Sequence, residues 1–209
     1  SMSKMDHTQE SIGGVMREQR RHQRIRFNSL PSVRLGQFGC AGTGTLENLS
    51  LSGLMLRSAL PLKVNEPVGC EFSVFDSPLI DSSAVIVSRL GDLFGARFQA
   101  GPLSQYLIQS AIDSALASGR ASTLTINEVQ GRKVMRITGG LNAGLRNDFL
   151  HGVIKVGVSE IDLSEVTDID NEGVELCRPA RTEHQIPIVR PSACVRSLAV
   201  GSGSLAGFL

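Results

Sequence analysis

The stretch 47-ENLSLSG-53 places Asn48, Ser50 and Gly53 at fixed intervals at the end of an expected strand. Asparagine and serine side chains exchange hydrogen bonds with the edge of a ligand, and glycine lets the backbone approach closely. The same three residue types also make ordinary β-turns. The stretch alone therefore leaves a ligand site and a plain turn both open.

An arginine-rich segment lies upstream of this stretch. Residues 17–26 contain five arginines and one glutamate, and Arg20, Arg21 and Arg24 come just before the first expected strand. A guanidinium group binds phosphate through two hydrogen bonds and stacks on planar bases. The same residues also suit a solvated helix face. The arginines alone therefore leave a phosphate site and an exposed helix both open.

Short runs of alternating polarity in the first half of the chain predict strands. They are SVRLGQF (32–38), VGCEFSV (68–74), SAVIVSRL (83–90) and FGARFQ (94–99), separated by Gly, Pro, Asp and Ser. Five or six short strands at this spacing predict a small antiparallel barrel. Residues 101–120 follow with apolar residues at helical spacing and Gly119 at the expected stop, so we place a boundary near residue 120.

The second half of the chain alternates between strand and helix patterns. Residues 124–140 predict two strands around a turn, and 141–155 predict a helix. A buried strand (158–166), a helix (171–184), a short strand (186–191) and a last helix (192–201) complete the series. Such alternation favours an α/β layer domain.

The two motifs taken together resemble the PilZ domain family, whose pattern is R-x-x-x-R followed by [D/N]-x-S-x-x-G. Arg20 and Arg24 match the first part, and Asn48, Ser50 and Gly53 match the second. The resemblance covers about residues 17–118 and implies a barrel with a carboxy-terminal helix, in which GARF (95–98) looks like the closing strand.

PilZ domains with both motifs bind the bacterial second messenger cyclic di-GMP. The resemblance implies that Arg20 and Arg24 hold phosphates and stack on guanine, with Arg21 assisting. It places Asn48, Ser50 and Gly53 at the guanine and ribose side. It implies no cofactor beyond this ligand.

An acidic stretch in the second half admits two interpretations. Asp168 and Asp170 are candidates for paired catalytic carboxylates, but no histidine, nucleophile or further ligand accompanies them. We favour helix capping, with Asp170 at the N-cap and Glu172 in the first turn. We therefore expect a protein that is not an enzyme.

Residues 161–173, IDLSEVTDIDNEG, resemble the STAS family, the domain of anti-sigma-factor antagonists and anion-transporter tails. The resemblance covers about residues 123–209 and implies a partner-binding surface at Asp168, Asp170, Asn171 and Glu172. Many members carry a phosphorylatable serine pair where this chain has Asn171 and Glu172. Serine phosphorylation is therefore impossible at those two positions, whereas partner binding is not affected.

These patterns together predict a multidomain protein. We expect a flexible arm (1–16), a PilZ-like antiparallel β-barrel domain (17–120) and a STAS-like α/β domain (121–209). The expected function is a cyclic di-GMP receptor that relays its state to an unidentified protein partner. The alternative is a scaffold in which both domains bind proteins and the messenger is irrelevant.

Composition limits which classes of protein the chain can belong to. The net charge of +1 argues against a general nucleic-acid binder. Neither a long apolar run nor a leader pattern occurs, so we expect a cytoplasmic protein without a membrane span. The four dispersed cysteines (Cys40, Cys70, Cys177, Cys194) and scattered histidines predict reduced core thiols and no metal site. A homodimer stays possible.

Overall fold

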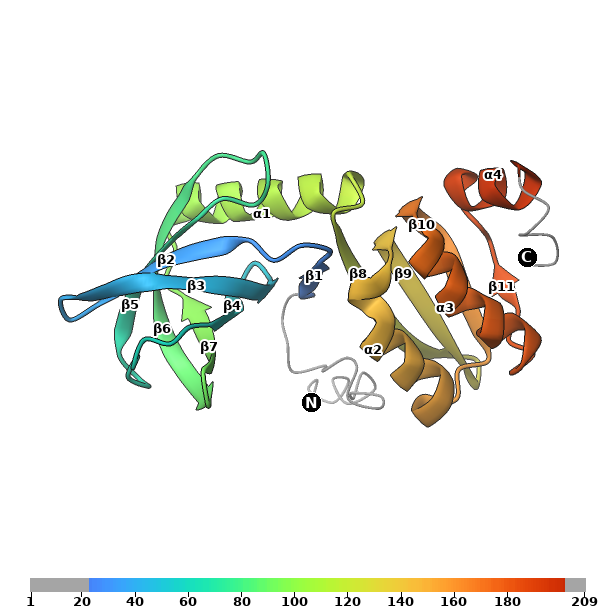
Figure 1. The fold of residues 1–209 in the computed structure, drawn as a ribbon, viewed down its shortest axis with the longest axis horizontal. Coiled ribbons are helices and arrows are strands. Elements are labelled where there is room, and N and C mark those ends of the chain that lie inside the picture. The colour runs from blue at the N-terminus through green and yellow to red at the C-terminus, as the bar shows by residue number, and fades with distance from the viewer. Residues whose placement is uncertain (1–22, 202–209) are drawn as a thin grey trace, which may run out of the picture. The chain divides into compact units, whose positions relative to one another are not determined.

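The computed structural model describes residues 23–201, which divide into two compact units (Figure 1). We call residues 23–121 the barrel unit and residues 122–201 the α/β unit. The predicted arm (1–16) and two of the predicted ligand residues, Arg20 and Arg21, lie outside the described residues.

The barrel unit is a six-stranded antiparallel barrel with one additional short strand. Its strands are β1 (Ile25–Phe27), β2 (Ser32–Gln37), β3 (Cys40–Leu49), β4 (Gly53–Arg57), β5 (Pro67–Phe72), β6 (Ile80–Leu90) and β7 (Leu93–Phe98). Six of them run in the order β3-β2-β5-β6-β7-β4, and pairing of β4 with β3 closes the barrel. Strand β1 lies outside this ring of six and pairs antiparallel with the end of β3.

The barrel core follows the predicted alternation of side chains. Val33 and Leu35 of β2 point inward, as do Val68, Cys70 and Phe72 of β5. Helix α1 (Pro102–Ala117) buries Ile108, Ala111, Ile112 and Ala115 and is followed by Gly119 at φ +76°. Glycine adopts this left-handed conformation without a Cβ clash, which explains why the helix stops there.

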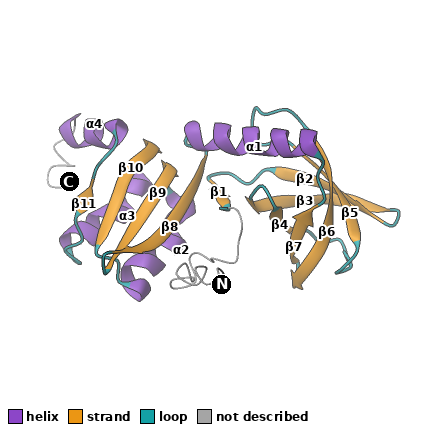
Figure 2. Ribbon diagram, turned by 180° about the vertical axis from the view of Figure 1, so that it is seen from behind, coloured by secondary structure: helices purple, strands orange, loops and turns teal. Residues whose placement is uncertain are grey.

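The α/β unit has a four-stranded mixed sheet. Its elements are β8 (Ala121–Val129), β9 (Arg132–Leu141), η2 (Ala143–Leu145), α2 (Arg146–Leu150), η3 (His151–Val156), β10 (Glu160–Ile169), α3 (Asn171–Thr182), β11 (Ile188–Val189) and α4 (Ala193–Gly201). Strands β8 and β9 form an antiparallel hairpin, whereas β10 pairs in parallel with β9 and with β11. Helices α2 and α3 lie on the same face of this sheet (Figures 1 and 2).

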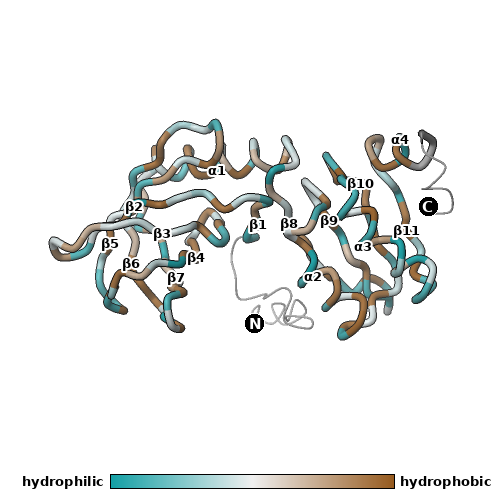
Figure 3. Tube along the Cα trace, viewed as in Figure 1, coloured by the Kyte–Doolittle hydropathy of each residue, from teal (hydrophilic) through white to brown (hydrophobic). Residues whose placement is uncertain are grey.

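Apolar side chains fill the space between that sheet and its helices. Met135 and Ile137 of β9 are buried, together with Phe149 of α2 and Val174 and Cys177 of α3. Each large side chain removed from water in this way contributes about 1.5–3 kcal/mol. The hydropathy trace of Figure 3 shows apolar residues along the strands of both units.

Several elements differ in detail from the sequence prediction. The helix predicted over residues 141–155 is a succession of a 3₁₀ turn (η2), an α-helix (α2) and a π-helix (η3). Helix α3 continues past Pro179 to Thr182. No helix within residues 23–201 is long and apolar enough to cross a membrane.

The prediction of core thiols is correct for two of the four cysteines. Cys70 and Cys177 are buried, and burial raises the pKa of each thiol to about 12. Cys194 is half-buried, and Cys40 is exposed because it starts β3 at the end of a tight turn. The prediction for Cys40 is therefore wrong.

Candidate functional site

Strand β1 brings Arg24 to the asparagine of the second motif. The register pairs Ile25 with Leu49 and Arg26 with Asn48, and Ile25 is buried, so the backbone just before β1 is anchored beside the end of β3. Arg24 is half-buried, and its Nη1 donates a hydrogen bond of 3.1 Å to Asn48 Oδ1. Residues 24 positions apart in the chain are thereby joined.

Ser50 organises the turn between β3 and β4. Its backbone N–H donates to the Gly53 carbonyl at 2.8 Å. Its Oγ accepts from the N–H groups of Ser52 (3.3 Å) and Gly53 (3.2 Å) and lies 3.3 Å from the Gly53 carbonyl. The side chain is almost fully buried, so its hydrogen-bonding capacity is spent on holding the turn.

Gly53 is required by a close approach between strands. A Cβ at this position would lie 2.3 Å from the carbonyl oxygen of Ala96 in β7. Strands β4 and β7 pair here, Gly53 opposite Arg97. The glycine therefore sets how tightly the barrel closes next to the turn.

In the described part of this site, each residue has a different structural role. Arg24 supplies the cation, Asn48 orients it through an amide oxygen, and Ser50 and Gly53 shape the turn behind it. A guanidinium held in this way can bind an anionic oxygen while its flat face accepts a stacked ring. The arrangement suits a phosphate-containing ligand with planar bases.

The second set of predicted residues surrounds the start of α3. Asp170 is the N-cap, and its Oδ1 accepts a 2.9 Å hydrogen bond from the Gly173 N–H. Glu172 lies in the first turn, so the capping prediction is confirmed for both residues. Asp168 and Asn171 are exposed beside them.

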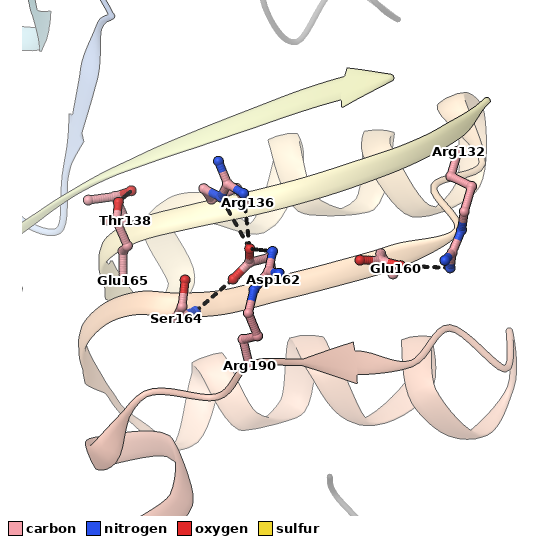
Figure 4. A network of polar contacts seen from close by, with 8 residues as sticks. All are labelled: Arg132, Arg136, Thr138, Glu160, Asp162, Ser164, Glu165 and Arg190. Atoms are coloured by element: carbon pink, nitrogen blue, oxygen red, sulfur yellow. Dashed lines mark hydrogen bonds and ion pairs between the residues drawn. The ribbon is translucent and has the colours of Figure 1, made fainter. Parts of the chain in front are cut away.

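A buried carboxylate in the α/β unit plays a part that the sequence did not reveal (Figure 4). Asp162 of β10 is fully buried, and its Oδ2 accepts hydrogen bonds from Arg136 of β9, at 3.1 and 3.2 Å, and from Arg190. Its Oδ1 accepts from the Ser164 N–H at 2.9 Å. Arg190 lies 28 positions away, so only the parallel pairing of β10 with β11 brings it near.

The electrostatics of Asp162 follow from these contacts. Burial acts to raise its pKa, but the hydrogen bonds from Arg190, Ser164 and Arg136 together outweigh burial and lower the pKa to about 2. The hydrogen bond to Asp162 likewise raises the pKa of Arg190. The network therefore stays charged at neutral pH and ties β9, β10 and the segment after β11 together.

Residues 18–114 match the model of the PilZ domain. The chain contains a PilZ domain. The matched range includes the arginine motif, the barrel strands and most of α1. No curated protein matches the chain.

Several solved structures are similar to part of the chain. The PilZ domain of YcgR from Escherichia coli, solved with c-di-GMP, is 19% identical over 46% of this chain and 90% of that chain, with a TM-score of 0.41. The PilZ domain of CeSA from a cellulose-synthesizing bacterium is 17% identical over 44% and 95%, with a TM-score of 0.38. The Bacillus subtilis motility inhibitor MotI/DgrA is 16% identical over 46% of this chain, and the match spans about half (51%) of that protein, with a TM-score of 0.38.

Among residues 23–201, no group of three or more His, Cys, Asp or Glu side chains is arranged to hold a metal ion.

Proposed function

We propose that the PilZ domain of this chain is a receptor for cyclic di-GMP. The proposal rests on one contact, the hydrogen bond from Arg24 Nη1 to Asn48 Oδ1, which joins the two ligand motifs in the fold. The match to the PilZ domain model over residues 18–114 supports the same ligand.

Within this site, Arg24 binds a phosphate of the ligand and stacks on a guanine. Arg20 and Arg21 complete the cationic wall. Asn48 lies at the guanine and ribose side, and it also fixes the direction of the Arg24 guanidinium. Ser50 and Gly53 contribute through the shape of the turn, since their polar atoms already bond to one another.

The α/β unit relays the bound state to a protein partner as a STAS-like domain. Two observations support this: an antiparallel hairpin that continues into parallel strands, and a helix that begins at the capped Asp170 directly after β10. The exposed residues Asp168, Asp170, Asn171 and Glu172 form the proposed partner surface. The corresponding division of the chain is an arm (1–16), a PilZ domain (17–120) and a STAS-like domain (121–209).

Calorimetric titration of the full chain with cyclic di-GMP at two salt concentrations tests the receptor proposal. We expect micromolar or tighter binding that weakens at high salt, because phosphate contacts to arginine are screened. Arg24→Ala should abolish the heat. Arg89→Ala, which removes an exposed arginine of β6 from a strand not involved in the site, is the matched control and should bind normally.

Two results would count against the receptor. Unchanged affinity in Arg24→Ala would show that the site is assigned wrongly. Absence of binding at any salt concentration would favour the alternative, a PilZ and STAS-like scaffold that acts without the messenger.

A further inference from the structure

The outer face of the barrel continues from the turn at Ser50 to strand β7. Strand β4 lies between β3 and β7 and pairs with both (Figure 1). Its first residue, Gly53, lies opposite Arg97 of β7. Ala96, the neighbour of Arg97 in β7, is buried in the barrel core. Because side chains alternate along a strand, Arg97 faces outward, next to the second motif.

Arg97 is a cation without a partner in the barrel. Its side chain is exposed, and within residues 23–201 its guanidinium makes no hydrogen bond or ion pair. By contrast, the exposed arginines Arg34, Arg57 and Arg89 each contact a carboxylate or a backbone carbonyl. The hydrogen-bond donors of Arg97 are therefore all available to a ligand.

Arg24 and Arg97 flank the turn between β3 and β4 from opposite sides. Arg24 directly precedes β1, whose register with β3 puts this arginine at the level of Ser50. The Ser50 N–H donates to the Gly53 carbonyl, so Gly53 and its partner Arg97 lie at the same level across the turn. Neighbouring strands lie about 4.8 Å apart, so three strand spacings separate the two arginine backbones by about 14 Å. The two side chains therefore span a ligand larger than a single phosphate.

The surface between the two arginines is flat and apolar. Gly53 has no side chain, and Met55, two residues further along β4, is half-buried on the same outer face. The Sδ atom of Met55 lies beside Gly95 of β7, 3.4 Å from where a Cβ of that residue would be. The Met55 side chain thus lies along the sheet. A thioether packs favourably against an aromatic ring, so this surface suits the face of a planar base.

We propose that Arg97 recognises a guanine of cyclic di-GMP and so determines the base specificity of the site. This inference rests on the receptor function proposed above. One guanine of the ligand stacks on Arg24, and the other extends across Gly53 with its face on Met55 and its edge toward Arg97. The Arg97 guanidinium donates two hydrogen bonds to the O6 and N7 acceptors of guanine. Adenine carries an amino group in place of O6 and cannot accept this pair.

The test is calorimetric titration of the full chain with cyclic di-GMP and with cyclic di-AMP, which has the same phosphates and different bases. We expect Arg97→Ala to weaken cyclic di-GMP binding about tenfold, the effect of a bidentate contact to one base, and to leave cyclic di-AMP binding unchanged. Arg97→Lys keeps the charge without the planar fork and should restore only part of the preference. Arg89→Ala removes the same charge from β6 and should bind both ligands like the unmodified chain.

An NMR measurement follows Arg97 directly. The ¹H–¹⁵N signal of Arg97 Nε, assigned by its loss in Arg97→Lys, should shift as cyclic di-GMP saturates the chain. The corresponding signal of Arg89, whose Nε donates to the Gly91 carbonyl, should stay in place. An unshifted Arg97 signal would overturn the contact, even where cyclic di-AMP binds too weakly to titrate.

The calorimetric outcomes separate this inference from the receptor proposal. If the unmodified chain does not bind cyclic di-GMP, or Arg24→Ala binds it equally well, the proposed site fails and the role of Arg97 fails with it. If Arg24→Ala abolishes binding while Arg97→Ala behaves like Arg89→Ala, the receptor stands and Arg97 has no part in it. If Arg97→Ala weakens both ligands equally, Arg97 contacts a phosphate and does not determine base specificity.

Discussion

In the proposed cyclic di-GMP site, which we call the messenger site, a residue can have two roles: it can contact the ligand, or it can hold in place a neighbour that contacts the ligand. Asn48 belongs to both, since its buried amide oxygen accepts from Arg24. We expect Asn48→Ala to weaken cyclic di-GMP binding about five- to tenfold, the effect of one hydrogen bond to a charged group near the surface. Calorimetry checks this, with Asn28→Ala, an exposed asparagine just after β1, as the control. Equal affinities in both variants would contradict a positioning role.

Gly53 and Gly36 provide a matched pair of glycine substitutions. In Gly53→Ala the new methyl group collides with the Ala96 carbonyl oxygen, so we expect the barrel to lose about 1–3 kcal/mol of unfolding free energy. Gly36→Ala meets open space and should gain about 0.5–1 kcal/mol. Hydrogen exchange of β4 and β7 amides measures both changes. Equal stability of the two variants would disprove the close approach as the cause.

Asp162 makes the stability of the α/β unit depend on pH. Its pKa is lowered from 3.8 to about 2 in the folded unit, so the unfolded chain binds the proton more readily. The stabilisation is present above pH 4, amounts to about 2 kcal/mol, and falls to about half by pH 3. We expect the stability difference between the unmodified chain and Asp162→Asn to shrink in the same way between pH 6 and pH 3. Urea unfolding at each pH measures it, and a pH-independent difference would exclude this carboxylate as the source.

At the scale of elements, sequence periodicity predicted the strands and helices that bury one continuous face. It did not predict contacts that depend on the register between strands. The alternation of β2 and β5 and the helical spacing of α1 were evident, because each buries one continuous face. Only the end of strand β3 was expected from the sequence, since its first part, CAGTGT, has small residues on both faces and few buried ones. The pairing of Gly36 with Gly69 was equally hidden, because these two residues become neighbours only through the register of β2 with β5.

The same distinction holds for the candidate sites. The spacing of Asn48, Ser50 and Gly53 was readable, but the separate task of each residue depends on burial and on the close contact with Ala96. The capping role of Asp170 was predictable because it is local in sequence. The partnership of Asp162 with Arg190 was not, since it needs β11 to lie beside β10.

Helix α3 allows capping to be separated from partner recognition. Asp170→Ala removes the acceptor for the Gly173 N–H and should cost about 1 kcal/mol of unit stability. Asn171→Ala leaves the cap intact and should cost much less, so any loss of partner affinity in that variant reports recognition alone. Amide exchange in the first turn of α3 measures the stability effect. If Asp170→Ala leaves this turn equally protected, the cap does not hold the helix start.

At the scale of the whole molecule, opposite charges are concentrated in two separate stretches of the sequence. The arginine motif precedes the barrel, whereas residues 160–175 of the α/β unit contain seven acids and no lysine or arginine. On the proposed function, a bound dinucleotide with two phosphates would change the charge at the arginine motif and would not itself alter the charge of the proposed partner surface. Any effect on the partner must pass through a change in the α/β unit, and this requirement makes the relay testable.

The relay predicts that the ligand alters hydrogen exchange in both units. At a hundredfold excess over its dissociation constant, cyclic di-GMP should stabilise the barrel unit by about 2.7 kcal/mol, through binding to the folded form alone. A coupling of about 1 kcal/mol between the units should in addition change exchange at the start of α3 about fivefold. Arg24→Ala should remove both effects together. If the barrel is protected while exchange in residues 160–182 stays constant, the chain binds the messenger without relaying it, and the partner surface acts independently of the ligand.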